Sequence, residues 1–287
     1  MDISTELYKV FYMVARYKSF SKAASKLFVS QSAVSQSVKS LEETLGFPLL
    51  IRTTKKVSLT IDGEILYTHL EQAFGLIDSA EEKLKTRQDH GHGQIIFAAT
   101  DTLCKYYLLP RIKKLSENFP GIKIKIINGT SIYCLNLLEK AKVDFALINI
   151  PHHLDANNFS IEKSYPFKDV FICRNSTPIP QSVNLKTIAE YPLLALDNKS
   201  VTRVYLDQLF LDNGINITPE VELQNVDLLI EMAAIGLGIA FVPDLCVKDR
   251  SLKILDIKEK IPVREYGIIS LKQLPHTPAA ETFLEYI

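Results

Sequence analysis

Three features are scarce in this sequence: paired cysteines, long apolar runs and catalytic motifs. The 287 residues include 4 cysteines, but no CxxC pair or histidine-rich cluster accompanies them, so neither a metal site nor a disulfide framework is expected. No apolar run approaches the ~20 residues of a membrane span, and the first residues carry charges, unlike a signal peptide. We therefore expect a cytoplasmic protein with reduced thiols, no metal and no membrane partner.

Catalytic signatures are also missing. The sequence contains no GxSxG, phosphate-binding loop, HExxH or dinucleotide fingerprint. The stretch Gly236-Leu237-Gly238 is too short for a fingerprint and precedes an expected strand instead of following one. We expect no enzyme and no cofactor.

Proline and charge divide the chain. Only Pro48 of the 13 prolines lies before residue 110, so the first hundred residues permit long helices and the rest should be rich in strands and turns. Lys+Arg and Asp+Glu both total 33, yet residues 1–60 hold nine basic and four acidic residues, a net of +5. A basic module in a neutral chain is typical of a nucleic-acid contact, although a solvated basic face has the same composition.

The basic module is expected to contain three helices, at 5–16, about 21–27 and about 31–45. Ser21 can cap the second helix and Ser30 the third. The third has one apolar face and one polar face that is nearly free of charge, formed by Ser32, Ser35, Gln36 and Lys39. Ser and Gln near a helix N-terminus suit the reading of base edges, so we interpret the second and third helices as a helix-turn-helix.

A two-stranded ribbon with a basic tip is expected next, over residues 49–59. Alone, such a turn is usually just solvated. Directly after a helix-turn-helix it indicates a wing that contacts phosphates or the minor groove. The wing residues are Arg52, Thr53, Thr54, Lys55 and Lys56.

A long helix should follow, capped by Thr60, with acidic residues in its first turn. Its apolar residues repeat at spacings of 4 and 3, which favours a helix–helix seam over packing on its own domain. The seam consists of Leu66, Leu70, Ala73, Ile77, Ala80 and Leu84. Residues 89–93 contain Gly and His and are expected to form a flexible hinge.

From Gln94 onward, strands and helices alternate in two sets, which predicts two α/β lobes with mainly parallel sheets and a cleft. Polar residues cluster where strands meet helices, the place where open α/β sheets bind ligands. Each alone is more often a helix cap, but four such junctions favour one effector site. Helix N-termini and Arg203 favour a small anion such as a carboxylate. The expected lining is Thr100, Asp101, Thr102, Thr130, Ser131, Asn149, Ser200, Thr202, Arg203 and Asn225.

These features resemble the LysR-type transcriptional regulators. The dense match is Phe20-Ser21-Lys22-Ala23-Ala24 with Leu27, then Val29-Ser30-Gln31-Ser32-Ala33-Val34-Ser35-Gln36, and it continues to Gly63. A looser match includes Leu108-Leu109-Pro110 and the stretch from Gly236 to Pro243. The resemblance implies that the side of the third helix that faces the DNA groove also includes Gln31. Ser21 is a further expected DNA contact. The resemblance further implies a periplasmic-binding-protein-like effector domain and a linker helix that pairs two subunits.

The expected organisation follows from the pattern and the resemblance together. A winged helix-turn-helix occupies 1–59, a linker helix 60–88, a hinge 89–93, and an effector domain 94–287. Its first lobe is placed at 94–160 and 267–287, and its second at 161–266. Expected partners are double-stranded DNA with dyad symmetry, a small-molecule effector and further copies of the chain in a homodimer or a homotetramer (a dimer of dimers), with RNA polymerase as a further candidate.

Two alternatives stay open. Cys104 can sit at a helix N-terminus, where a thiolate is favoured, which would suit a redox-responsive regulator. A solute-binding protein would use the same two lobes without needing the basic module.

Overall fold

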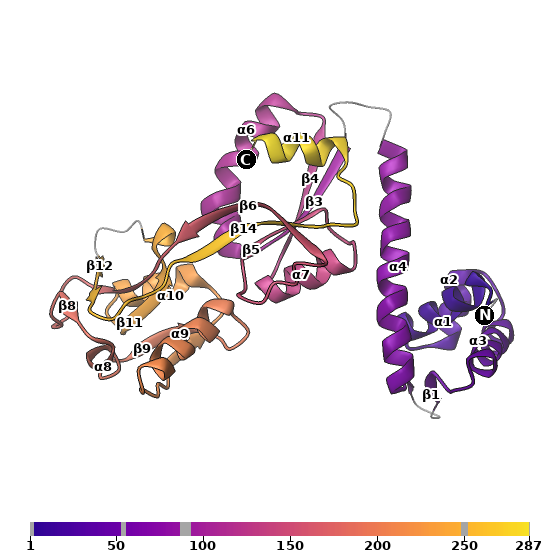
Figure 1. The fold of residues 1–287 in the computed structure, drawn as a ribbon, viewed down its shortest axis with the longest axis horizontal. Helices are drawn as coiled ribbons and strands as arrows, with labels where there is room; N and C mark the ends of the chain where they lie inside the picture. The colour runs from indigo at the N-terminus through magenta and orange to yellow at the C-terminus, as the bar shows by residue number, and fades with distance from the viewer. Residues whose placement is uncertain (1–2, 53–55, 87–92, 248–251, 287) are drawn as a thin grey trace. The chain divides into compact units, whose positions relative to one another are not determined.

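A computed structural model describes residues 3–52, 56–86, 93–247 and 252–286 (Figure 1). The chain divides into two compact units, Met1–Glu81 and Glu82–Ile287. Each has its own hydrophobic core, because each contains enough apolar side chains to bury one face of every long element. The predicted wing tip at 53–55 and most of the predicted hinge, 87–92, lie outside the described residues.

The first unit is a helical head with a small ribbon. Its core gathers one face of each of the first three helices, and Phe11, Val34 and Leu41 are fully buried. The ribbon is antiparallel, with Leu50 opposite Leu59. The elements are α1 Thr5–Tyr17, α2 Phe20–Leu27, α3 Gln31–Leu45, β1 Leu50–Arg52, β2 Val57–Leu59 and α4 Ile61–Thr86.

Capping residues set where these helices begin. The Ser30 hydroxyl accepts a hydrogen bond from the Ala33 N–H (3.1 Å), and the Thr60 hydroxyl accepts one from the Gly63 N–H (3.0 Å), as predicted. The prediction for α2 was wrong by two residues, because Ser19 rather than Ser21 caps it. The helix begins at Phe20, which packs against the head core, and the Ser19 hydroxyl accepts a hydrogen bond from the Lys22 N–H.

The first lobe of the second unit is built on a five-stranded sheet of order β4-β3-β5-β14-β6. The ring of Phe283 packs against Phe97 and Phe145 on one face of this sheet, so α11 covers that face, and α7 contacts β3 and β5. The strands are β3 Gly93–Ala99, β4 Ile122–Asn128, β5 Phe145–Asn149, β6 Phe159–Phe167 and β14 Arg264–Leu271. The helices are α5 Asp101–Leu103, a π-helical turn η1 Cys104–Leu108, α6 Leu109–Asn118, α7 Ser131–Glu139 and α11 Pro278–Tyr286.

The second lobe has a sheet of order β10-β9-β11-β7-β12, with one buried cluster on each face. Phe210 of α9 is buried in one cluster and Leu229 of α10 in the other, so helices cover both faces. The strands are β7 Asp169–Arg174, β9 Leu193–Leu196, β10 Val221–Leu223, β11 Ile239–Pro243 and β12 Leu252–Ile254, with a small pair β8 Ser182–Val183 and β13 Asp256–Ile257. The helices are α8 Leu185–Ile188, α9 Val201–Asp212, α10 Val226–Ala234 and η2 Asp244–Cys246.

Two expectations about the lobes are corrected. Both large sheets are mixed, since β14 and β7 run antiparallel to their neighbours. The strand β6 was not predicted at all, and β14 begins at Arg264 rather than 266. Both strands belong to the first sheet, so the chain passes between the lobes after 167 and before 264, not at 160 and 267.

Candidate functional site

The turn between α2 and α3 is fixed by hydrogen bonds. Phe28 ends α2 in the left-handed region (φ 58°), and the Val29 N–H donates to the Ala24 carbonyl. The Ser21 hydroxyl then donates to Oε1 of Gln31 (2.9 Å), which ties the start of α2 to the start of α3. These contacts hold two helices in the short-helix, turn, longer-helix order of a helix-turn-helix.

The outer face of α3 is polar as predicted. Val34 and Val38 are fully buried, while Gln31, Ser32, Gln36 and Lys39 are exposed and Ser35 is half-buried. The side-chain amide of Gln36 makes no hydrogen bond to any part of the chain that the structure describes, so it is available to a base edge. The amide oxygen of Gln31 is already engaged by Ser21, so Gln31 offers donors outward. That these side chains bind DNA stays a prediction.

The ribbon is anchored to the head by a carboxylate. Oε1 of Glu42 accepts hydrogen bonds from the N–H groups of Leu49 (2.8 Å) and Leu50 (3.1 Å). Arg52 ends β1 and Lys56, which is exposed, precedes β2, so both flank the turn. Thr53, Thr54 and Lys55 lie outside the described residues.

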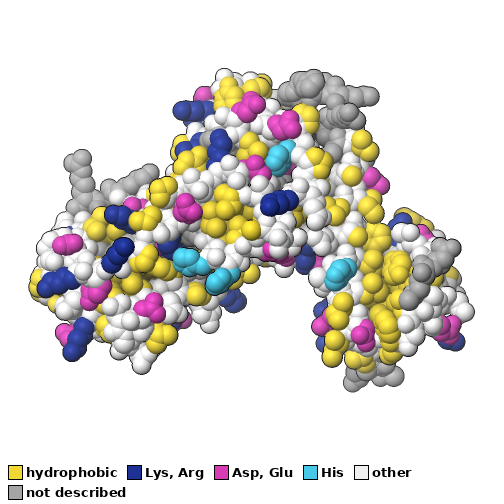
Figure 2. Space-filling model, viewed as in Figure 1, with side chains coloured by type: hydrophobic (Ala, Val, Ile, Leu, Met, Phe, Trp, Pro, Cys, Tyr) yellow, Lys and Arg dark blue, Asp and Glu magenta, His cyan; other side chains and the backbone are white. Residues whose placement is uncertain are grey.

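The predicted seam on α4 divides into two parts. Leu66 and Leu70 are half-buried against the core of the head, so in this chain they also serve the packing on its own domain that was weighed as the alternative. Ala73, Ile77, Ala80 and Leu84 are exposed, and Figure 2 shows apolar side chains on the surface over α4. An exposed apolar stripe is available to another helix, but its role in dimerisation stays a prediction.

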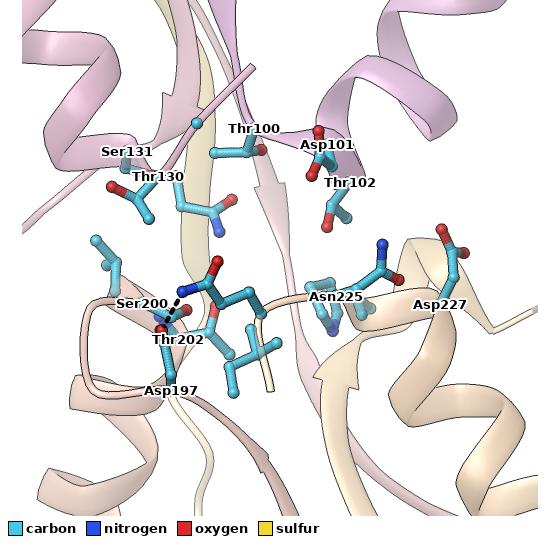
Figure 3. Close-up of a pocket in the computed structure, with 17 residues that line it drawn as sticks. Thr100, Asp101, Thr102, Thr130, Ser131, Asp197, Ser200, Thr202, Asn225 and Asp227 are labelled. Carbon is cyan, nitrogen blue, oxygen red and sulfur yellow. Dashed lines mark hydrogen bonds between the residues drawn. The ribbon is translucent and has the colours of Figure 1, made fainter. Parts of the chain in front are cut away.

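A cavity of about 140 Å³ lies between the two lobes of the second unit (Figure 3). Nine of the ten predicted effector residues line it: Thr100, Asp101, Thr102, Thr130, Ser131, Asn149, Ser200, Thr202 and Asn225. That they bind an effector is untested.

The cavity gathers four helix starts. Thr100, Thr130 and Ser200 accept hydrogen bonds through their hydroxyls from N–H groups of α5, α7 and α9, and Oδ1 of Asn225 accepts one from the Leu228 N–H of α10. These residues are therefore both helix caps and cavity lining. The remaining N–H groups of each first turn have no partner within the helix and favour negative charge.

The prediction that Arg203 lines the effector cavity is wrong. Arg203 does not line the cavity, and its side chain is only 11% exposed. Its guanidinium donates to Asp207 one turn on, to Glu222 (2.8 Å) and to the Leu196 carbonyl (3.0 Å). Because two carboxylates already neutralise it, Arg203 contributes no free positive charge to a ligand.

Two aspartates that the sequence prediction missed do line the cavity. Asp227 of α10 accepts hydrogen bonds from Nζ of Lys105 (2.7 Å) and the Tyr106 hydroxyl (2.5 Å), which belong to the first lobe. Asp197 accepts them from Nε2 of Gln224 (2.8 Å) and from the Lys199 N–H (3.2 Å). Asp197 directly follows β9, and Asp227 is in the first turn of α10, so the strand-to-helix rule that identified their neighbours applied to them as well.

A buried ion pair lies at the crossing between the lobes. Nε and Nη2 of Arg264 donate to the two carboxylate oxygens of Asp169 (2.6 and 3.0 Å), and Nη2 also donates to the Thr202 hydroxyl (2.9 Å). Burial raises the pKa of Asp169, and Arg264 opposes that effect. Since Thr202 also lines the cavity, this pair connects the crossing strands to the site.

The cysteines do not support thiolate chemistry. Burial raises the pKa of Cys104, although the side chain of Asn128 acts in the opposite direction. Burial likewise raises the pKa of Cys134 to about 12 and that of Cys246 further still. These thiols are protonated at neutral pH, unlike reactive cysteines. Among the described residues, no helix combines the length and apolar character needed to cross a membrane.

Comparisons with known proteins agree with the two units. Residues 5–64 match the family described as "Bacterial regulatory helix-turn-helix protein, lysR family", and residues 88–287 match "LysR substrate binding domain". A "Probable RuBisCO transcriptional regulator" from Phaeodactylum tricornutum is 27% identical, over 94% of this chain and 91% of that protein.

Two solved structures share the fold. The effector-binding domain of QuiR in complex with shikimate has a TM-score of 0.59 and 18% identity, over 68% of this chain and 95% of that one. Full-length CbnR complexed with its target DNA has a TM-score of 0.54 and 17% identity, over 99% and 98%. The two family matches together span nearly all of the chain, which therefore belongs to the LysR family of helix-turn-helix regulators.

Proposed function

We propose that this protein is a transcriptional regulator that binds a specific DNA site through α3 and the wing and responds to a small polar molecule in the cavity between its lobes. The observation that carries the proposal is the presence, in one chain, of an exposed polar face on α3 that is nearly free of charge and a cavity ringed by four helix starts. A head alone would serve any DNA-binding protein, and two lobes alone would serve a solute-binding protein.

The DNA half of the proposal assigns separate tasks to separate side chains. Gln36 reads a base edge, since its amide has a donor and an acceptor side by side. Arg52 and Lys56, together with Lys55, neutralise phosphates, which carries no sequence information. Two copies of the head, joined through the exposed part of the α4 stripe, would match a DNA site with dyad symmetry.

The effector half of the proposal requires that the two lobes can move relative to each other. A ligand shifts a regulator only if it binds one arrangement better than another. The cavity is lined by both lobes, so a ligand there contacts both at once. Coupling of this kind commonly amounts to about 1–3 kcal/mol, or five- to 150-fold in affinity for DNA.

The test uses a DNA site selected from random sequence with the purified full-length protein. Gln36→Ala should weaken binding to the selected site by about 1–3 kcal/mol and leave binding to scrambled DNA nearly unchanged. Gln208→Ala, an exposed glutamine on α9 in the second unit, is the matched control. Equal losses on both DNAs would remove Gln36 from the reading face, and failure to select any site would refute sequence-specific binding.

The redox alternative is not favoured, because burial raises the pKa of Cys104. The solute-binding alternative does not account for the head. We propose no enzymatic activity and no cofactor, and we place the protein in the cytoplasm, where it has access to DNA.

A further inference from the structure

The charges around the cavity do not match a simple anion. Three aspartates line it, Asp101, Asp197 and Asp227, and the described lining contains no Lys, Arg or His. Lys105 neutralises Asp227 from outside the lining. Four helix starts favour negative charge, so the cavity presents both attractive and repulsive features to a carboxylate.

The two kinds of feature are only partly separated in space, because Asp197 lies at the same end as Ser200 and Thr202 (Figure 3). In Figure 3, Asp101, Thr102, Asn225 and Asp227 lie at one end of the cavity, and Thr130, Ser131, Ser200 and Thr202 lie at the other. At the hydroxyl end, Asp197 is engaged by Gln224 and by the Lys199 N–H. At the carboxylate end, the side-chain carboxylate of Asp101 makes no hydrogen bond to the part of the chain that the structure describes.

The hydroxyl end also contains a polar side chain that has no hydrogen-bond partner among the described residues. Ser131, at the start of α7, is only 4% exposed and lines the cavity. Its hydroxyl has no hydrogen-bond partner among the described residues. The hydroxyl oxygen itself is not among the buried unpartnered atoms of the described chain, so it is open to the cavity and can donate a hydrogen bond to a carboxylate there.

We infer that the cavity takes a zwitterion of the amino-acid class, with its carboxylate at the starts of α7 and α9 beside Ser131 and its ammonium group at the carboxylate of Asp101. This inference rests on the proposed effector site. A cavity of about 140 Å³ accommodates roughly ten non-hydrogen atoms, if each takes the ~10–15 Å³ that one water needs. Leu196, Val201 and Pro243 provide apolar lining for a short side chain.

The experiment is a thermal-shift screen of the full-length protein with the twenty standard L-amino acids, followed by calorimetric titration of those that shift the melting temperature. Each hit is compared with two matched analogues, the acid that lacks the amino group and the amine that lacks the carboxylate. At least one amino acid should raise the melting temperature by several degrees, since a ligand that binds only the folded state stabilises it. Both analogues should bind at least tenfold more weakly.

Two variants locate the ammonium group. Asp101→Asn should weaken amino-acid binding about five- to tenfold and change the binding of the deaminated acid much less. Glu117→Gln on α6 removes the same charge away from the cavity and is the matched control, which should leave both affinities unchanged. Asp227→Asn leaves Lys105 without its carboxylate, so the preference should shift toward the deaminated acid.

The outcomes separate this inference from the proposed function. If carboxylic acids without an amino group bind and amino acids do not, the zwitterion is refuted and an effector site remains. Equal affinity of an amino acid and its deaminated analogue also refutes the assigned role of Asp101. If no member of either series binds while DNA binding is intact, the zwitterion inference is refuted and the regulator's DNA half stands.

Discussion

The buried pair of Arg264 and Asp169 should dominate the stability of the second unit. Asp169 is fully buried, Arg264 is 6% exposed, and three hydrogen bonds of 2.6 to 3.0 Å satisfy the guanidinium on this side. Replacing Arg264 by Met keeps an unbranched side chain but removes the guanidinium, whose carbon lies over the rings of Phe167 and Tyr205, and leaves a carboxylate buried without its cation. Breaking such a pair costs about 3–5 kcal/mol.

This cost should depend on pH in a defined direction. Burial raises the pKa of Asp169, and Arg264 acts against that rise. Without Arg264, the pKa in the folded state rises further above the unfolded value, so the protonated form becomes the stable one. Arg264→Met should therefore destabilise most at pH 7 and above, and the loss should shrink as the pH falls through the raised pKa.

Denaturant unfolding and thermal unfolding measure these effects. For a unit of this size, about 3–5 kcal/mol lowers the melting temperature by roughly 6–20 °C. The double variant Arg264→Met with Asp169→Leu should recover most of the loss, because replacing both partners by apolar groups is often nearly neutral. A loss below 1 kcal/mol at pH 7, or a double variant as unstable as the single one, would refute this reasoning.

Three further predictions concern other parts of the chain. Ile77→Asp should abolish dimers in sedimentation experiments together with operator binding, because a charge cannot be buried in the seam; unchanged assembly would contradict the seam. Gly63→Ala should destabilise the head by about 1–3 kcal/mol in thermal unfolding, because its Cβ would lie 2.0 Å from the Leu49 carbonyl oxygen; Gly214→Ala, where nothing lies within 4 Å but φ is +71°, shows the cost of conformation alone. Partial burial acts to raise the pKa of Asp227, but the hydrogen bonds from Lys105 and Tyr106 outweigh it and lower the pKa. The inter-lobe contact should therefore stabilise the unit above about pH 4 and be lost below it, and Lys105→Met should reduce that acid dependence in unfolding experiments.

The head could be predicted from sequence because its signals are local. The Ser30 hydroxyl caps α3 by accepting a hydrogen bond from the N–H of Ala33, only three residues further along the chain. The buried residues Val34 and Val38 lie one helical turn apart. The same is true of the cavity caps, since Thr130 and Asn225 each bond to an N–H three residues on. Nothing beyond the spacing of neighbours was needed to place these elements.

Strand β6 could not be predicted for a physical reason. Its sequence from Phe159 to Phe167 includes polar residues and Pro166, which suggest a loop. It lies at the edge of the sheet and pairs only with β14, so the missing N–H of Pro166 breaks no interior ladder. An edge strand is stabilised by its neighbour, and that neighbour is about a hundred residues away in sequence.

Arg203 and Arg264 show how far a local rule extends to charged residues. Arg203 lies in the first turn of α9, and Arg264 begins β14, where the chain returns to the first lobe. The sequence prediction chose Arg203 as a ligand contact. In the structure, Arg203 is neutralised by Asp207, an i+4 neighbour that the sequence displays, and by Glu222. Arg264 instead donates to Asp169, 95 residues away, and also directly to the hydroxyl of Thr202, which lines the cavity.

The charge balance of the cavity is therefore set by pairing rather than by composition. Lys105, Arg203 and Arg264 each have a carboxylate partner, whereas the carboxylate of Asp101 has none in the part of the chain that the structure describes. The unpaired carboxylate of Asp101 at one end and the starts of α7 and α9 at the other make the polarity of the site independent of the chain's zero net charge. For that reason the ligand class follows from which charges remain unpaired after folding, which the sequence does not state.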